Sequence, residues 1–124
     1  MLPNHQIAAL AYTSGFIQKP EAQKYMVGYL QAVRAYLDAF TKGKNKDQVV
    51  QVLAKETKID DTKLWSEMVP AGLDPNGKLN VKSIHDTEDF FKKLNLTPAD
   101  APPPSAFIDE SFATKAAQTL GPYS

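Results

Sequence analysis

The sequence predicts a mostly α-helical chain of about five helices, preceded by one N-terminal strand. Apolar residues recur at helical spacing over about four turns after Pro20. Helix-capping residues and helix-ending glycines or prolines bracket the other apolar segments. A short apolar run between polar flanks, near the N-terminus, is typical of a buried strand instead.

That run, residues 5–13, reads HQIAALAYT and ends at the polar break that begins with Thr13. Its length and flanks favour a buried strand, although Ala8 and Ala9 weaken the β signal and leave a helix open. One strand cannot form a sheet alone. We therefore expect its partners outside this sequence or in a second copy of the chain, with self-association through the unpaired strand.

The longest helix is expected to begin at Pro20, which fits a first helical position, and to end at Gly43. Its apolar stripe consists of Met26, Tyr29, Leu30, Val33, Leu37 and Phe40. Gly28 inside the helix suggests that a neighbouring element packs closely there. This helix also carries aromatic residues at helical spacing, namely Tyr25, Tyr29, Tyr36 and Phe40. We expect them to belong to the core and not to a ligand site, by about four to one.

Two shorter helices are expected next. One starts at Asn45, with Gln48 three residues later as a loose capping box. The other starts after Asp60 and ends before Pro70. Their apolar residues are Val49, Val50, Val52 and Leu53 in the first, and Leu64, Trp65 and Met68 in the second.

A turn and an amphipathic helix occupy residues 69–96. Asp74, Pro75, Asn76 and Gly77 suit a type I turn, and Asn80 can cap the helix that follows. Its apolar face holds Val81, Ile84, Phe91 and Leu94, widened by Phe90. Residues 97–105 hold four of the nine prolines and predict an extended crossing. The last helix is expected to run from a cap at Asp109 to Gly121.

Composition excludes several classes of function. Fourteen basic and fourteen acidic residues give no net charge, which removes the electrostatic footprint of a nucleic-acid binder and any attraction to an anionic membrane. The chain has no cysteine, no apolar window of transmembrane length and no signal-peptide pattern, so as written it would stay where it is made.

We expect no catalytic, cofactor or metal site. The two histidines, His5 and His85, lack partners at metal-ligand spacing, and glycine-rich phosphate loops and nucleophile elbows are absent. The paired acids lie at helix starts, where capping explains them. The candidate ligand-binding residues are Asn4, His5 and Gln6, at the start of the expected strand. A surface loop explains this cluster about equally well.

Four stretches, in this order, resemble one known family. They are LPNHQIAALAYTSGFI, KPEAQKYMVGYLQAVRAYLDAFTKGK, MVPAGLDPNGKLNVKSIHDTEDFFKKLNL and FIDESFATKAAQTLGPYS. Together they resemble the C-terminal part of the periplasmic substrate-binding proteins of ABC importers. The most similar group is the one that serves thiamine-pyrimidine precursors, sulfonates such as taurine, and nitrate-like solutes.

The resemblance implies an α/β parent fold, the type II periplasmic binding fold, which closes around a small solute and presents it to a membrane permease. Residues 1–124 would supply the strand that re-enters the first lobe and helices of that lobe, without a complete second lobe. The implied protein is periplasmic and not an enzyme. Asn4, His5 and Gln6 would border the solute cleft at the lobe crossing.

A full member of that family is more than twice this length and takes most ligand contacts from its other half. The chain therefore looks like a C-terminal fragment, a truncated reading frame or an excised domain, and we expect it not to bind the solute usefully alone. The alternative is a free-standing helical module that binds a partner protein through an exposed apolar face.

Overall fold

In a computed structural model, which describes residues 4–98 and 100–124, the chain forms six α-helices and one 3-10 turn. The elements are α1 (Ser14–Ile17), α2 (Pro20–Lys42), α3 (Lys46–Thr57), α4 (Thr62–Glu67), α5 (Val81–Lys93), η1 (Pro104–Ala106) and α6 (Ser111–Leu120). The predicted mostly helical class is confirmed. The additional helix is the single turn α1, which begins where a strand was expected to end, because the Thr13 hydroxyl accepts a hydrogen bond from the Phe16 N–H at 3.2 Å.

The predicted N-terminal strand is wrong, because residues 5–13 are irregular and no strand occurs in the described part of the chain. A strand requires a neighbour that accepts its backbone hydrogen bonds. Here the Gln6 N–H donates to the Ser83 hydroxyl on α5 instead. Ile7, the first large apolar residue of this run, is 90% exposed, so the expected burial of the run does not occur there. The predicted self-association through an unpaired strand therefore has no basis in the described residues, because they contain no strand.

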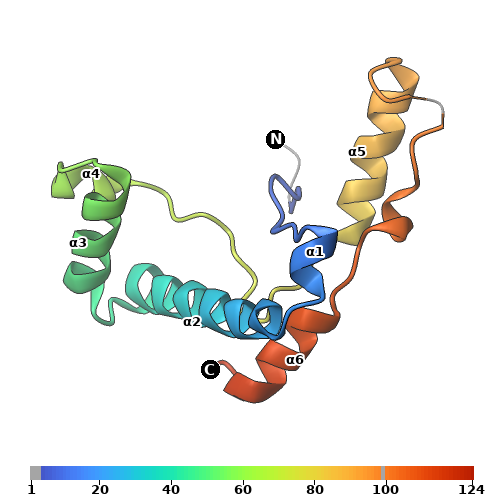
Figure 1. The fold of residues 1–124 in the computed structure, drawn as a ribbon. Coiled ribbons are helices and arrows are strands. Elements are labelled where there is room, and N and C mark those ends of the chain that lie inside the picture. Colours follow the sequence, from blue (N-terminus) through green and yellow to red (C-terminus); the bar gives the residue numbers. More distant parts are fainter. Residues whose placement is uncertain (1–3, 99) are drawn as a thin grey trace.

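Helix α2 is the centre of the fold, and α6 packs across it (Figure 1). Pro20 stands in the first turn of α2, and Gly43 ends it in the left-handed conformation, with its N–H bonded to the Asp38 carbonyl, as predicted. The buried residues of the two helices are Ala22, Leu30, Val33 and Ala39 on α2, and Ala113 and Ala116 on α6. Most are alanines, which let the helix axes approach closely but bury little apolar area.

The predicted turn before α5 is confirmed: the Gly77 N–H donates to the Asp74 carbonyl at 3.0 Å. The Asp74 carboxylate also accepts the N–H groups of Asn76 and Lys78. Asn80 caps α5 as expected, through a bond from the Ser83 N–H. In contrast, Gly28 has no neighbour within 4 Å of a Cβ placed on it, so the predicted close packing there is wrong.

Other helix starts lie one residue from their predicted caps. Asp61 caps α4 in place of Asp60, through bonds from two N–H groups of the first turn. Glu110 precedes α6, while Asp109 accepts the Ser111 N–H at 2.8 Å. The proline-rich segment, of which Ala99 lies outside the described residues, is irregular until η1.

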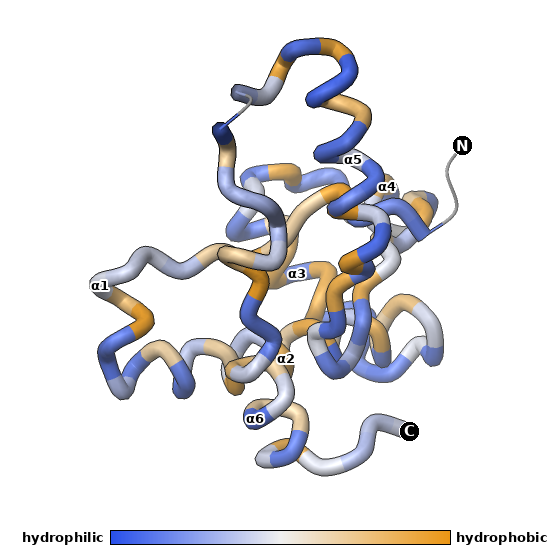
Figure 2. The backbone as a smooth tube through the Cα atoms, turned by 90° about the vertical axis from the view of Figure 1, so that its right-hand side faces the viewer, coloured by the Kyte–Doolittle hydropathy of each residue, from blue (hydrophilic) through white to orange (hydrophobic). Residues whose placement is uncertain are grey.

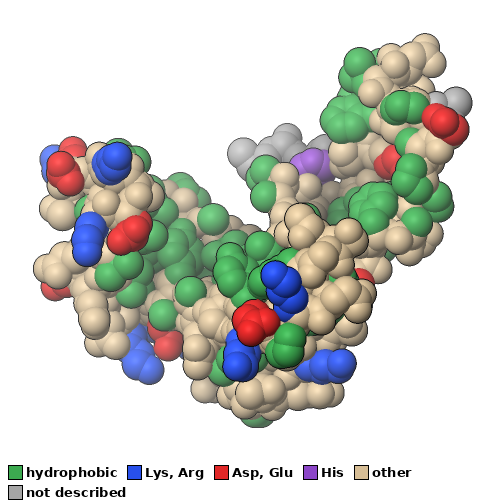
Figure 3. Space-filling model, viewed as in Figure 1, with side chains coloured by type: hydrophobic (Ala, Val, Ile, Leu, Met, Phe, Trp, Pro, Cys, Tyr) green, Lys and Arg blue, Asp and Glu red, His purple; other side chains and the backbone are tan. Residues whose placement is uncertain are grey.

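The molecule is open, with two arms that leave opposite ends of α2 (Figure 1). Helices α3 and α4 form one arm, and α5 forms the other. The tube in Figure 2 alternates between hydrophobic and hydrophilic positions along the helices, which is typical of amphipathic helices. In the space-filling view, hydrophobic side chains line the space between the arms and also cover part of the α5 arm (Figure 3).

This arrangement buries little of its apolar surface. The accessible surface is 9213 Å². A compact protein of 13.7 kDa exposes about 6,600 Å² by size scaling, so roughly 2,600 Å² is in excess. The large buried aliphatic residues in the described core are Leu30, Val33 and Val50. The helices therefore leave more surface exposed than a compact chain of this mass, around a small buried core.

Candidate functional site

The predicted ligand-binding residues Asn4, His5 and Gln6 lie together at the N-terminus of α5. The Asn80 N–H donates to Gln6 Oε1 at 2.9 Å, and Asn80 Nδ2 donates to the Asn4 carbonyl at 2.6 Å. The Gln6 N–H reaches Ser83 Oγ at 3.0 Å, and His5 Nδ1 lies 3.0 Å from the same hydroxyl. The chain thus brings all three to one place, where they tie the N-terminal segment to a helix start.

Most polar groups of this cluster are already used within the chain. Gln6 accepts through its side-chain oxygen and donates through its side-chain nitrogen, to the Ala8 carbonyl at 2.6 Å. Ser83 is buried, and its hydroxyl faces both the Gln6 N–H and the His5 ring. The described residues contain no group of three or more His, Asp or Glu that could hold a metal ion. The main role of this cluster is therefore to cap the N-terminus of α5.

A hollow of about 430 Å³, the N-terminal hollow, opens beside this cluster. Its walls come from residues 6–12, from α1, α2 and α5, and from the segment that enters α6. Gln6 is the one predicted ligand-binding residue that lines it. The other walls are mostly apolar, and they include Ile17, Met26, Leu79, Ile84, Ile108 and Phe112. Its volume falls within the range of small-molecule sites.

Aromatic contacts hold one side of this hollow. The Tyr12 ring meets Phe112 edge to face, with ring centroids 5.5 Å apart, and its hydroxyl donates to the Ala22 carbonyl at 2.8 Å. Burial, and secondarily the nearby Tyr25, raises the pKa of the Tyr12 phenol. Tyr12 therefore stays a neutral hydrogen-bond donor at neutral pH and joins the N-terminal segment to both α2 and α6.

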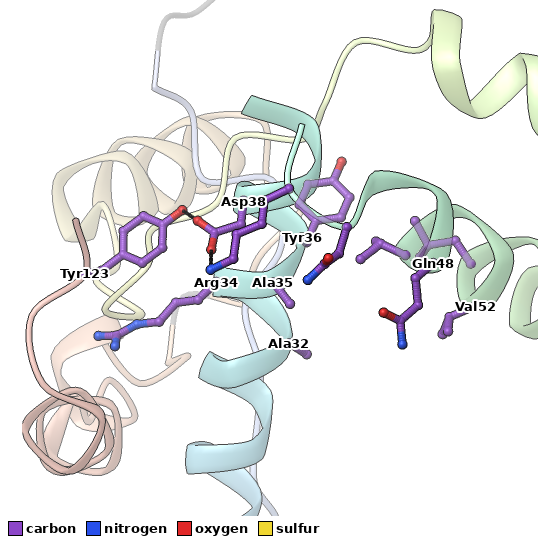
Figure 4. Close-up of a pocket in the computed structure, with 12 residues that line it drawn as sticks. Ala32, Arg34, Ala35, Tyr36, Asp38, Gln48, Val52 and Tyr123 are labelled. Atoms are coloured by element: carbon purple, nitrogen blue, oxygen red, sulfur yellow. Dashed lines mark hydrogen bonds and ion pairs between the residues drawn. The ribbon is translucent and has the colours of Figure 1, made fainter. Parts of the chain in front are cut away.

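A larger hollow of about 620 Å³, the α2–α3 hollow, lies between those two helices and the C-terminal tail. Its apolar walls are Ala32 and Ala35 on α2 and Val49, Val52 and Leu53 on α3. In Figure 4 the two alanines lie on the side of α2 toward Gln48 and Val52. Helix α2, the arm that begins with α3 and the C-terminal tail contribute to this surface, which sequence spacing did not predict.

The polar end of the α2–α3 hollow is an ion-pair network around Asp38. Lys42 Nζ lies 2.9 Å from Asp38 Oδ1. The Tyr123 hydroxyl donates to the same oxygen at 2.8 Å (Figure 4). These two bonds, Lys42 first, lower the pKa of Asp38 to about 2. Lys42 also lies 4.2 Å from the Tyr123 ring centroid and donates to the Ser124 carbonyl. The network fastens the C-terminal tail to α2.

Sequence reasoning missed this network and the nearby Arg34, whose guanidinium carbon lies 5.7 Å from the Tyr123 ring centroid. A signal was present only for the pair Asp38 and Lys42, four residues apart on one helix. The Tyr123 contact spans 85 residues, and no local pattern indicates it. None of the four aromatic residues predicted to be core is buried: Tyr25 and Tyr29 are exposed, and Tyr36 and Phe40 are only partly buried.

No protein-family model matches the chain, and searches of curated proteins and of solved structures find no similar protein. No described helix has both the length and the apolar content needed to cross a membrane.

Proposed function

We propose that this chain is the C-terminal portion of a non-catalytic solute-binding protein of an ABC importer. Two kinds of observation support the proposal. The four sequence stretches resemble that family in order and spacing. The observation that carries the proposal is structural: the helices leave roughly 2,600 Å² more surface exposed than a compact chain of this mass.

An excess of this size requires a large complementary surface. Obligate protein interfaces bury about 2,000–5,000 Å² in total and resemble a divided core. A lobe that carries the sheet of an α/β fold would cover the apolar faces of these helices, because helices in such folds bury one face on a sheet. The proposal therefore explains why helices with clear apolar stripes form so thin a core.

In the assembled protein, Asn4, His5 and Gln6 would border the solute cleft, where the chain crosses between lobes. Gln6 supports this assignment most directly, because it lines the N-terminal hollow. Its carboxamide is held by the Asn80 N–H and the Ala8 carbonyl, so its orientation is fixed before a solute arrives. The solute is small and reaches the membrane permease by lobe closure, in the periplasm.

The proposal is tested by complementation in solution. The chain is mixed with the N-terminal part of a solute-binding protein of the thiamine-precursor or sulfonate group, and complex formation is followed by light scattering after size exclusion. Thermal melting of the complex is then measured with thiamine-pyrimidine precursors, alkanesulfonates and aromatic acids. A 1:1 complex whose melting temperature rises with one solute class supports the proposal.

A second test uses the gene. An upstream reading frame that encodes a signal peptide and a half rich in βαβ units would agree with the proposal. A monomeric chain whose apolar helix faces do not bind a hydrophobic dye would contradict it, because the helices would then need no further lobe.

The second candidate is a free-standing helical module that binds a partner protein. The α2–α3 hollow favours it, because its apolar walls and open side suit a partner side chain or helix better than a sealed solute site. The two candidates differ in the complementation experiment. A module binds its partner with no effect of any solute, whereas a binding-protein portion gains a solute-dependent melting shift.

A further inference from the structure

Helix α5 carries a self-complementary row of side chains on its exposed face. Asp86, Phe90 and Lys93 are spaced by four and three residues, so they lie on one face of the helix, with Leu94 beside them. All four are exposed: Phe90 by 57% and Leu94 by 52%. The α5 arm stands away from α2 and α3 (Figure 1).

The two charges of this row lie on opposite sides of Phe90, at nearly equal distances along the helix. The acid lies four residues before the aromatic ring, and the base lies three residues after it. In an antiparallel helix pair related by a two-fold axis at Phe90, the residues before Phe90 in one copy lie against the residues after Phe90 in the other. Phe90 then lies beside Phe90 of a second copy, and Asp86 of each copy faces Lys93 of the other.

We propose that two copies of this chain associate through α5 in this antiparallel arrangement. The interface has an aromatic centre and a charged border, which is the usual anatomy of a contact between proteins. Phe91 adds to the centre, with its ring centroid 6.0 Å from that of Phe90. The pairing covers part of the exposed area of the chain and does not depend on the proposed transport function.

Some charges of α5 already form ion pairs within the helix, and this weakens the contact between the two copies. Lys82 holds Asp86 at 2.6 Å, but the Asp86 side chain remains 61% exposed and accessible to a second cation. Lys93 makes no ion pair among the described residues and is exposed. A helix of 13 residues is about 20 Å long, so the interface is at the small, transient end of the range. We expect a dissociation constant of about 10–100 µM.

The test is sedimentation velocity of the chain alone, with no solute and no second lobe, from about 1 µM to about 1 mM. The wild type should shift from monomer to dimer over this range. Asp86→Lys and Lys93→Asp each place like charges opposite one another, and each should weaken association at least about tenfold. Phe90→Ser should abolish the dimer. Lys24→Asp, which changes the net charge as Lys93→Asp does but lies on α2, should leave it unchanged.

The two charge variants also provide a rescue. An equal mixture of Asp86→Lys and Lys93→Asp chains brings opposite charges together at both ends of the row, so a heterodimer should form where neither variant dimerises alone. Circular dichroism of each variant confirms that its helices are intact. A wild type that remains monomeric, single variants that dimerise normally, or a mixture without heterodimer would each overturn the proposal. Complementation by a second lobe is unaffected by any of these results.

Discussion

Arg34 Nη2 donates to Asn76 Oδ1 at 3.0 Å, which joins the middle of α2 to the turn that precedes α5. The same guanidinium donates through Nε to the Pro75 carbonyl at 3.0 Å, and Nη1 lies 3.5 Å from the Leu120 carbonyl at the end of α6. One side chain therefore connects three segments that are far apart in the sequence. In an open molecule with a thin core, such a connection fixes the position of the α5 arm.

Replacing Arg34 by Ala should lower the free energy of unfolding by about 1–3 kcal/mol, because the turn and α6 lose hydrogen bonds to a charged donor. Arg34→Lys should recover little of the loss, since an ammonium cannot reproduce the planar fork that reaches two acceptors of the turn. Urea titration followed by circular dichroism measures both changes. Lys24→Ala on the exposed side of α2 is the control, with an expected change within about 0.5 kcal/mol. A lysine variant as stable as the wild type would contradict this role.

Gly77 lies directly over the α2–α6 contact. Its φ is +73°, and a Cβ added there would meet Leu30 Cδ2 and Ala113 Cβ at 3.1 Å each. Gly77→Ala should therefore cost about 1–3 kcal/mol of stability, from backbone strain and crowding together. Gly28→Ala is the matched comparison, because Gly28 is helical and has open space around it. That variant should stabilise the chain by about 0.5–1 kcal/mol. Equal effects of the two substitutions would show that neither the φ angle nor the contact matters.

The sequence predicts the helices well because their signals are local. The apolar period of α2, its Pro20 start and its Gly43 end lie within 24 consecutive residues. The Asn80 cap of α5 is likewise adjacent in sequence to the helix that it starts. The strand predicted for residues 5–13 is wrong because a short apolar run has the same appearance in a strand, a helix or an irregular segment. Its conformation here depends on Ser83, which lies more than 70 residues later.

The candidate site could be predicted only in part for the same reason. Asn4, His5 and Gln6 form a group of neighbouring polar residues in the sequence, and the structure brings their polar groups together at the start of α5. Their attachment to α5, and the contact of Tyr123 with Asp38, depend on which helices pack side by side. No spacing within one segment carries that information.

The bond between Gln6 and the Asn80 N–H stabilises the start of α5. Gln6→Ala should weaken amide-exchange protection in the first turn of α5 and cost about 1 kcal/mol, as losing a helix cap does. Hydrogen exchange followed by mass spectrometry locates the change. Gln51→Ala, at an exposed position on α3, should leave α5 protection unaltered. Unchanged protection of α5 in the Gln6 variant would mean that the capping bond contributes nothing.

The attachment of the C-terminal tail should depend on pH through Asp38. Its folded pKa of about 2 is below the ordinary value of 3.8, so the ionised form is favoured when Lys42 and Tyr123 are in place. The stabilisation is therefore present above the ordinary pKa and is lost as the pH falls through the folded pKa. Carbon NMR of the Asp38 carboxyl should give a midpoint near 2, with a concerted change in the Tyr123 ring signals.

Tyr123→Phe removes one of the two hydrogen bonds and keeps the aromatic ring. The pKa of Asp38 should rise in this variant but stay below its ordinary value, because Lys42 still donates to the carboxylate. Lys42→Met should raise the pKa further, since the Lys42 bond makes the larger contribution. Asp109 is an internal reference: its lowered pKa is due to the Ser111 N–H and should not respond to either change. If the Asp38 midpoint is the same in both variants and the wild type, the tail is not held by this network, and the α2–α3 hollow lacks the fixed wall that Tyr123 provides.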